Sequence, residues 1–478
     1  MLNTLRSWWQ DKLLRGVLKN SSYLFSSNTL SAALSMVSSI FATRLLGFTG
    51  WGLVVIIQTF TSNTNRLLSF RMSEVVVKYL GQALADDERV EGVVGAASGV
   101  NAQPVTANPQ AAAIVKGIGL IEAATSILAY LVLVLLAPLA ARLLAQDVSI
   151  ASLIPFYGLM LLANLVYETS TGVLQAHKRF DRLALINTGQ SFLTVILVVL
   201  AFLLKRSVLE VLGAYLVGKA FAGIFISLLA FQQMSQSQGR GWWRTSLRQA
   251  AGWRGIIGFA INTNLNGTVN LVTRDNIVLY LPALSPANLA QTYAGYFKWG
   301  LSIINFVTLP IDPFIWPTYA EITRTIAQHQ WQQTRTLLKR VSAIAATWTL
   351  SAAVVIGLLG WWLIPLILGP ASAPVYPLAL ILLIGYGTAN ILNWNRPLLL
   401  AFGKPSYPLL IAVAVGVIEL LLISWLVPMG GYLVMAAVLA GYLAISVGII
   451  AWRGWHEIRH QEALGLQPVA PASKDILV

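Results

Sequence analysis

Residues 112–138 have the sequence AAIVKGIGLIEAATSILAYLVLVLLAP, in which one lysine and one glutamate are the only charged residues. A helix that crosses a bilayer needs about 20 mostly apolar residues, and this stretch is longer than that. Comparable stretches recur along the whole chain, which has 478 residues, of which 56% are hydrophobic and 10% charged. Soluble domains carry about 25% charged residues. The sequence therefore predicts an all-α polytopic membrane protein.

About twelve such stretches are present, six in each half of the chain. They cover about 21–45, 51–79, 112–138, 150–176, 182–204, 207–231, 255–283, 287–316, 338–368, 374–400, 406–427 and 430–452. Most basic residues outside them fall in the connections on one side, and only four lie on the other, namely Arg44, Arg142, Lys205 and Arg206. Because basic connections stay in the cytoplasm, we expect a multi-pass protein of the cytoplasmic membrane with both termini inside.

The connections divide the chain into five predicted parts. They are an interfacial amphipathic helix over 1–20, an N-terminal six-helix lobe over 21–231 with a cytoplasmic loop at 81–111, a basic cytoplasmic linker over 232–254, a C-terminal six-helix lobe over 255–452, and a cytoplasmic tail over 453–478. Tryptophans beside Arg244 and Arg254 in the linker are typical of membrane-interface anchors. A trace of duplication links the lobes, since Asn164 and Lys178 recur as Asn390 and Lys404 at one constant offset.

Besides the basic residues assigned to the connections and the span ends beside them, six lie inside the predicted spans, where a cation costs roughly 2.5–3.5 kcal/mol or more unless it faces protein or water. Counting about 1.5 Å per residue from the span ends places Arg71 and Arg396 near the cytoplasmic ends. The same count places the other four deep in the membrane, namely Arg66, Lys219, Arg274 and Lys298. This bias toward buried positive charge predicts an anion that passes through, or rests within, the membrane.

Polar residues repeat at steps of three and four on three spans, which puts each set on one helix face. The sets are Asn28, Ser31, Ser35 and Ser38; Thr59, Ser62, Asn63, Arg66 and Ser69; and Thr263, Asn266, Asn270 and Arg274. Such residues either bond one membrane helix to another or line a hydrated cavity. We favour a cavity for the two sets that include an arginine and leave both interpretations open for the first span.

Five acidic residues lie inside spans, namely Glu122, Glu168, Asp275, Asp312 and Glu419. The first three are candidates for a buried ion pair or for a coupling-ion site that takes H⁺ or Na⁺. Asp275 directly follows Arg274, and adjacent helical residues point apart, so their mutual neutralisation is not automatic. The chain has no cysteine, which excludes disulfides and cysteine-based metal or redox chemistry. Its four histidines fall in loops or the tail. We therefore expect no catalytic residues, no metal site and no cofactor.

Short motifs carry a family resemblance. Arg44-Leu-Leu-Gly47 followed by Gly50-Trp-Gly52, at the turn between the first two spans, resembles a signature of polysaccharide and oligosaccharide exporters. The turn after the fourth span, Leu174 to Lys178, is also similar to that family. These exporters belong to the superfamily that contains the multidrug and toxin extrusion transporters and the lipid II flippases. The resemblance covers about 20–452 and implies two six-helix lobes around a central cavity.

The resemblance implies a flippase for polyprenyl-diphosphate-linked oligosaccharide that works by alternating access during surface polysaccharide export. On this hypothesis Arg66, Lys219, Arg274 and Lys298 line the cavity and neutralise the diphosphate, and the polar faces, including Asn28, Asn63, Asn266 and Asn270, contact sugar. The expected partners are the lipid-linked substrate, membrane lipids and other polysaccharide-assembly proteins, but not nucleic acid, although the net charge is +14.

Two alternatives remain open at this point. A multidrug or cation antiporter of the same superfamily would favour buried carboxylates, whereas the buried charge here is biased toward cations. A membrane glycan polymerase or glycosyltransferase generally needs a sizeable outer loop or an acidic outer motif. The predicted outer loops are short and nearly free of acidic residues, Asp147 and Glu210 being isolated exceptions. We therefore expect a transporter rather than an enzyme.

Overall fold

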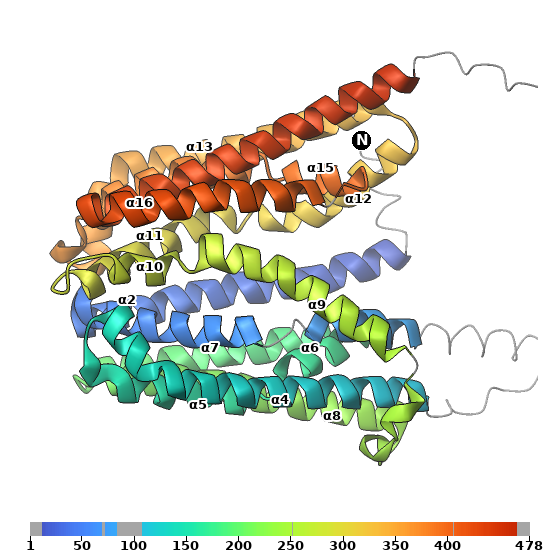
Figure 1. Ribbon diagram of the computed structural model, residues 1–478, viewed down its shortest axis with the longest axis horizontal. Coiled ribbons are helices and arrows are strands. Elements are labelled where there is room, and N and C mark those ends of the chain that lie inside the picture. Colours follow the sequence, from blue (N-terminus) through green and yellow to red (C-terminus); the bar gives the residue numbers. More distant parts are fainter. Residues whose placement is uncertain (1–11, 69–71, 84–107, 251, 405, 466–478) are drawn as a thin grey trace, which may run out of the picture. The chain divides into compact units, whose positions relative to one another are not determined.

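The computed structural model describes residues 12–68, 72–83, 108–250, 252–404 and 406–465, and every regular element within these ranges is a helix (Figure 1). The predicted all-α architecture is confirmed. The chain forms two compact units, Met1–Gly295 and Tyr296–Val478. The boundary between them lies within α11 (Ala290–Thr308). The linker over 232–254, where we expected the lobes to meet, lies inside the first unit.

The first unit begins with α2 (Lys12–Leu68), which has two helical arms because Gly47 turns the chain at φ 68° and ψ 177°. A helix over 72–83 follows. The remaining elements are α4 (Pro109–Ala140), η1 (Ala141–Ala145), η2 (Val148–Ser152), α5 (Leu153–Ala163), α6 (Tyr167–Ala176), α7 (Phe180–Leu203), α8 (Val208–Gln238), η3 (Trp242–Arg244), η4 (Leu247–Gln249), α9 (Trp253–Asn270), η5 (Leu271–Asp275) and α10 (Ile277–Ala283).

Two glycines of the motif at 44–52 are required for different structural reasons. Gly47 adopts a positive φ that L side chains rarely tolerate. Gly52 allows the second arm of α2 to approach the first turn of α11, because a Cβ at this position would overlap the carbonyl oxygen of Gln291. A hydrogen bond of 2.9 Å between the Thr49 and Thr292 hydroxyls joins the same two segments. The motif therefore specifies a turn and a close helix contact within the first unit.

The second unit contains the rest of α11, then η6 (Asp312–Phe314), α12 (Ile315–Ala327), α13 (Trp331–Leu368), η7 (Pro370–Ser372), α14 (Val375–Ile391), α15 (Asn395–Ala401) and α16 (Ser406–Gly465). Gly431, with φ 61° and ψ −147°, divides α16 into two arms. The indole of Trp348 on α13 donates to the carbonyl of Val307 on α11 at 2.8 Å. Gly300 of α11 packs closely against Leu378 of α14.

Two predicted spans are interrupted in the middle. The fourth span breaks between α5 and α6 at 164–166, and the tenth breaks between α14 and α15 at 392–394. Asn164 lies in the first break and bonds to Met160 of its own helix, whereas Asn390 lies in the last turn of α14 and bonds to Thr349. The matched asparagines therefore occupy different positions relative to the breaks, although both spans are interrupted.

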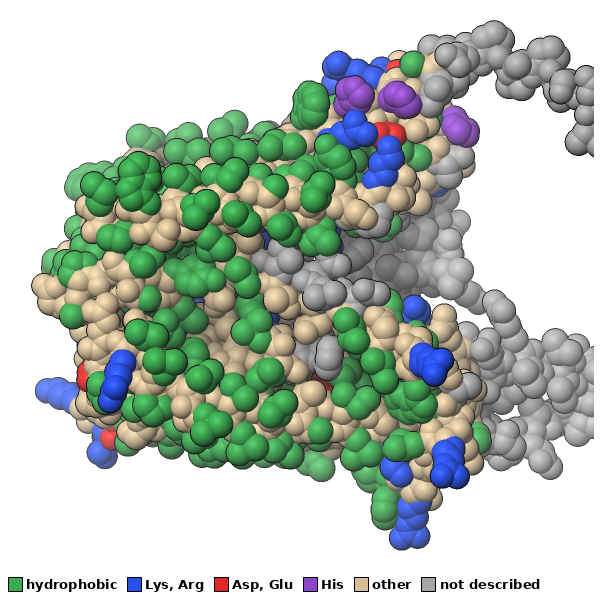
Figure 2. Space-filling view, in the orientation of Figure 1, with side chains coloured by type: hydrophobic (Ala, Val, Ile, Leu, Met, Phe, Trp, Pro, Cys, Tyr) green, Lys and Arg blue, Asp and Glu red, His purple; other side chains and the backbone are tan. Residues whose placement is uncertain are grey.

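Eight helices in the described ranges are long and apolar enough to cross a membrane, and two of them, in α2 and α16, contain a kinked pair of arms. The predicted spans at about 255–283 and 287–316 are not among the eight. They form the interrupted α9–η5–α10 segment and α11. On the face shown in Figure 2, hydrophobic side chains cover the sides of the helices and basic side chains gather toward their ends. Only 11% of the most apolar stretch of α13 is buried inside the protein, as expected for a helix that faces lipid.

The ends of the chain differ in part from expectation. The predicted surface helix over 1–20 lies mostly outside the described residues, and from Lys12 onward the chain already belongs to α2. The predicted tail from 453 is instead helical as far as Gly465. This extension is held by protein contacts, because the Glu457 carboxylate, 3% exposed, lies 2.7 Å from Lys404 and 3.4 Å from Arg453. Most of the loop over 81–111, namely 84–107, lies outside the described residues.

Candidate functional site

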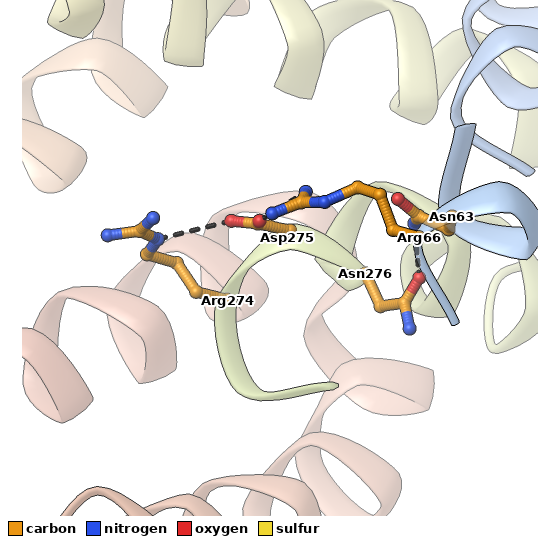
Figure 3. A network of polar contacts seen from close by, with 5 residues as sticks. All are labelled: Asn63, Arg66, Arg274, Asp275 and Asn276. Carbon is orange, nitrogen blue, oxygen red and sulfur yellow. Dashed lines mark hydrogen bonds and ion pairs between the residues drawn. The ribbon is translucent and has the colours of Figure 1, made fainter. Parts of the chain in front are cut away.

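The second arm of α2 and the interrupted α9–η5–α10 segment bring charged side chains together in the first unit (Figure 3). Nη1 of Arg66 lies 2.7 Å from Oδ2 of Asp275, and Nε of Arg274 lies 3.2 Å from Oδ1 of the same carboxylate. Beside them, the Asn63 amide donates a short hydrogen bond to Oδ1 of Asn276. Two predicted cavity cations, Arg66 and Arg274, and one predicted ion-pair or coupling residue, Asp275, therefore form one cluster around a single carboxylate.

Local backbone geometry explains how this cluster forms. Asn63 and Arg66 are three residues apart on α2, so they share a helix face. Arg274 and Asp275 lie in the π-helical turn η5, where the chain leaves regular α-helical geometry. We expected these neighbours to point apart, but the Arg274 side chain bends back and its Nε reaches the adjacent carboxylate. The π-helical turn therefore places the Asp275 carboxylate between the two guanidinium groups (Figure 3).

Two guanidinium groups contact one carboxylate in this cluster. The Arg66 and Arg274 side chains are 44% and 46% exposed, while Asp275 is 23% exposed. A guanidinium has five N–H donors, and the contacts with Asp275 use one nitrogen of each arginine. In Figure 3 the terminal nitrogens of Arg274 point away from Asp275. Such an arrangement can bind an anion through charge-assisted hydrogen bonds.

The other two predicted cavity cations do not join the cluster in the described contacts. Lys219 is exposed on α8, and Lys298 is half-buried on α11 in the second unit. Among the described residues, no carboxylate lies within ion-pair distance of either ammonium group. Their place in a common cavity stays a prediction. Arg396 is exposed on α15, and Arg71 lies outside the described residues.

The polar face of the first span splits into two kinds of residue. Ser31 donates to the Asn187 carbonyl at 3.4 Å, and Ser38 accepts from the Tyr215 hydroxyl at 3.3 Å, so these two serines connect helices. Asn28 and Ser35 are exposed. On the second span Asn63 is 6% exposed and bonded within the cluster. The side chains of Asn266 and Asn270 lie outside the described part of the structure.

Glu122 has a role that neither sequence interpretation included. Its carboxylate, on α4, accepts hydrogen bonds of 2.8 Å from the backbone N–H groups of Glu168 and Thr169. These groups begin α6, directly after the break at 164–166, so Glu122 caps a helix inside a membrane span. Glu168 in turn accepts from the Ser73 hydroxyl at 2.5 Å. The sequence shows both glutamates but not the break that brings them together.

Glu419 on the first arm of α16 is the most isolated buried carboxylate in the described residues of the second unit. The residue is 2% exposed, and neither oxygen has a hydrogen-bond partner among the described residues. The sequence placed it among acidic residues inside spans, but gave no sign that it would be isolated. A carboxylate without partners in a membrane interior is costly when charged, so this position suits binding of a proton or a cation.

Comparisons with known proteins agree with this organisation. Residues 17–323 match the family described as polysaccharide biosynthesis protein. Over 191 residues the chain is 26% identical to the inner membrane protein YghQ of Escherichia coli K12, a match that covers 40% of this chain and 48% of that protein. The chain therefore spans about half the length of this curated relative.

Solved structures show the fold that the chain shares. An inward-facing multidrug resistance MATE transporter of the MOP superfamily superposes with a TM-score of 0.66 at 12% identity, covering 91% of this chain and 96% of that one. The lipid II flippase MurJ in an inward closed conformation superposes with a TM-score of 0.62 at 12% identity, covering 94% and 91%. At such identities the likeness concerns the fold alone.

Proposed function

Because this chain belongs to the polysaccharide biosynthesis protein family, we propose that it is a flippase for polyprenyl-diphosphate-linked oligosaccharide. It would carry this substrate across the cytoplasmic membrane by alternating access, as part of surface polysaccharide export. The observation that carries the proposal is the cluster in which Arg66 and Arg274 share one carboxylate. A binding site for a neutral or cationic passenger would not need two arginines inside predicted spans.

The chemistry of a diphosphate suits this cluster. Its oxygens accept hydrogen bonds on several sides, and guanidinium groups bind phosphate through paired, charge-assisted N–H donors. Each arginine in the cluster is nearly half exposed, so an anion can reach it without unfolding the helices. The headgroup would therefore bind between the second arm of α2 and η5.

Asp275 would act as a counterion that holds the two guanidinium groups while no substrate is bound. Both of its oxygens are engaged, one by each arginine. A phosphate that enters would compete with the carboxylate for the same donors, and the arginines would exchange partners. This exchange keeps the affinity for the anion moderate, which a transporter requires because it must also release its cargo.

The experiment is translocation in vesicles that contain purified protein and a fluorescent polyprenyl-diphosphate-linked oligosaccharide. We expect Arg66→Gln and Arg274→Gln to reduce flipping strongly. Arg324→Gln is the matched control, because Arg324 is also an exposed arginine paired with a carboxylate, Glu321, but lies at the end of α12. Equal flipping by all three variants would contradict the proposal.

One observation favours a second candidate, a multidrug or cation antiporter. Glu419 is a buried carboxylate without a bonded partner in the described residues, as a proton- or cation-coupled exchanger would need. A flippase coupled to H⁺ or Na⁺ would need the same group, so Glu419 alone does not separate the two. Efflux of a cationic dye from vesicles, lost in Glu419→Gln and retained in Arg66→Gln, would support the antiporter.

A further inference from the structure

The segment between α8 and α9 has two chemically distinct sides. Its inner side is part of the hydrophobic core of the first unit, through Trp242, Ala250 and Trp253. Three contacts hold it in place: the Trp242 and Phe231 rings are 5.6 Å apart, Nζ of Lys116 donates to the Thr245 carbonyl at 2.9 Å, and the Trp253 indole donates to the Leu247 carbonyl at 3.2 Å. The segment is therefore packed against the first unit by specific contacts.

The outer side combines exposed basic and exposed apolar side chains. Trp243 and Leu247 are 48% and 37% exposed, and Arg240, Arg244 and Arg248 are exposed beside them. The guanidinium of Arg244 lies 4.7 Å from the centre of the Trp243 ring. Figure 1 shows this segment extending past the end of α8, and in Figure 2 the same place carries basic and hydrophobic side chains together. We call these five residues the basic–aromatic patch.

The positive charge of the patch is not compensated. Between Glu210 and Asp275 the sequence contains no acidic residue. Within the described part of the chain, none of the three arginines has a carboxylate at ion-pair distance. Basic side chains beside an exposed indole match a lipid surface, where the arginines meet phosphate and the tryptophan enters the headgroup region.

We infer that the basic–aromatic patch binds the headgroups of anionic phospholipid at the membrane surface. The preference for negatively charged lipid comes from the three arginines of the patch. The apolar contact comes from Trp243 and Leu247, and any phospholipid can make it. The patch lies far along the chain from Arg66 and precedes α9, which leads to Arg274. Its occupancy by lipid is separate from the binding of substrate in the cluster.

The chain has no cysteine, so Gln249→Cys provides a unique site for an environment-sensitive fluorophore next to the patch. The labelled, detergent-solubilised full-length protein is titrated with phosphatidylglycerol, with phosphatidylcholine and with inorganic phosphate. We expect phosphatidylglycerol to shift the emission at lower concentration than phosphatidylcholine, and inorganic phosphate to have no effect. The same midpoint for both lipids would overturn the proposal, and so would a shift with inorganic phosphate alone.

Variants separate the two contributions. Replacing Arg240, Arg244 and Arg248 with Gln should raise the phosphatidylglycerol midpoint about 100-fold, at roughly fivefold per basic side chain. The matched control replaces three other exposed cations, Arg142, Lys205 and Arg206, and should leave the midpoint unchanged. Trp243→Ala should weaken the binding of both lipids equally. If the triple variant does not fold, Arg244→Gln alone should raise the midpoint about fivefold, and an unchanged midpoint there would refute the assignment.

Discussion

Nη1 of Arg66 lies 2.7 Å from Oδ2 of Asp275, although 209 positions separate the two residues in the chain. The contact joins the second arm of α2 to the π-helical turn η5. The contact therefore brings charged side chains from two predicted spans of the first unit together at one place. Because Arg274 contacts the other oxygen of Asp275, the carboxylate organises two arginines that would otherwise repel each other.

The first prediction concerns this carboxylate. Asp275→Asn should lower stability by at most about 1 kcal/mol, because both ion pairs are partly exposed. The loss of the competing carboxylate should also tighten the binding of inorganic diphosphate, measured by the protection of purified protein against thermal unfolding.

Exchanging the charges of the pair, in a double variant with Arg66→Asp and Asp275→Arg, should restore part of the stability that Arg66→Asp alone loses. Weaker diphosphate binding by Asp275→Asn would show that Asp275 is not a competing counterion.

The second prediction concerns the close helix contact at Gly52. Gly52→Ala should destabilise the first unit by about 2 kcal/mol or more, because the added methyl overlaps the Gln291 carbonyl and the helices must separate. Gly81→Ala is the control, since nothing lies within 4 Å of a Cβ at that helical position. Fluorescence-detected size-exclusion chromatography after heating compares the two. Equal thermal resistance of both variants would disprove the close contact.

The third prediction concerns the broken fourth span. Glu122→Ala should destabilise the protein by roughly 3 kcal/mol, because two buried backbone N–H groups at the start of α6 lose their acceptor. Glu122→Gln keeps one acceptor oxygen and should cost less. Thermal unfolding of the purified variants measures both. Should Gln prove as damaging as Ala, the negative charge at the helix N-terminus matters more than the hydrogen bonds.

The fourth prediction concerns the unexpected extension of α16. Glu457→Gln should destabilise the second unit by roughly 2 kcal/mol, because the buried carboxylate is contacted by both Lys404 and Arg453. Glu462→Gln removes a more exposed pair with Arg335 and should cost less than about 1 kcal/mol. Protease cleavage near the end of α16 reports the outcome. Equal cleavage of both variants would rule out Glu457 as the residue that anchors the extension.

The sequence predicted the elements of the candidate site better than their arrangement. Apolar length predicted the helices. The cost of a buried cation singled out Arg66 and Arg274, but also Lys219 and Lys298, which do not join the cluster in the described contacts. Asp275 was a candidate for an ion pair, but its contact with both arginines was not predictable, because it depends on the π-helical turn at 271–275, which has no sequence period of its own. The partner amide Asn276 was missed for the same reason.

Long-range contacts explain the other differences. The capping role of Glu122 requires the break at 164–166, and no glycine or proline marks this break in the sequence. The end of the last span was expected where charged residues begin, at Arg453. The helix continues because Glu457 pairs with Arg453 one turn earlier on α16 and also with Lys404, which precedes α16. No local pattern reveals the contact with Lys404.

The most direct test of the account is the rate at which reconstituted vesicles flip a polyprenyl-diphosphate-linked oligosaccharide when both cluster arginines are replaced. We predict that Arg66→Gln with Arg274→Gln lowers this rate at least about tenfold, equivalent to roughly 1.4 kcal/mol of lost stabilisation, while Arg324→Gln retains it. Flipping at the unaltered rate by the double variant, in protein that folds and reconstitutes normally, would contradict the account.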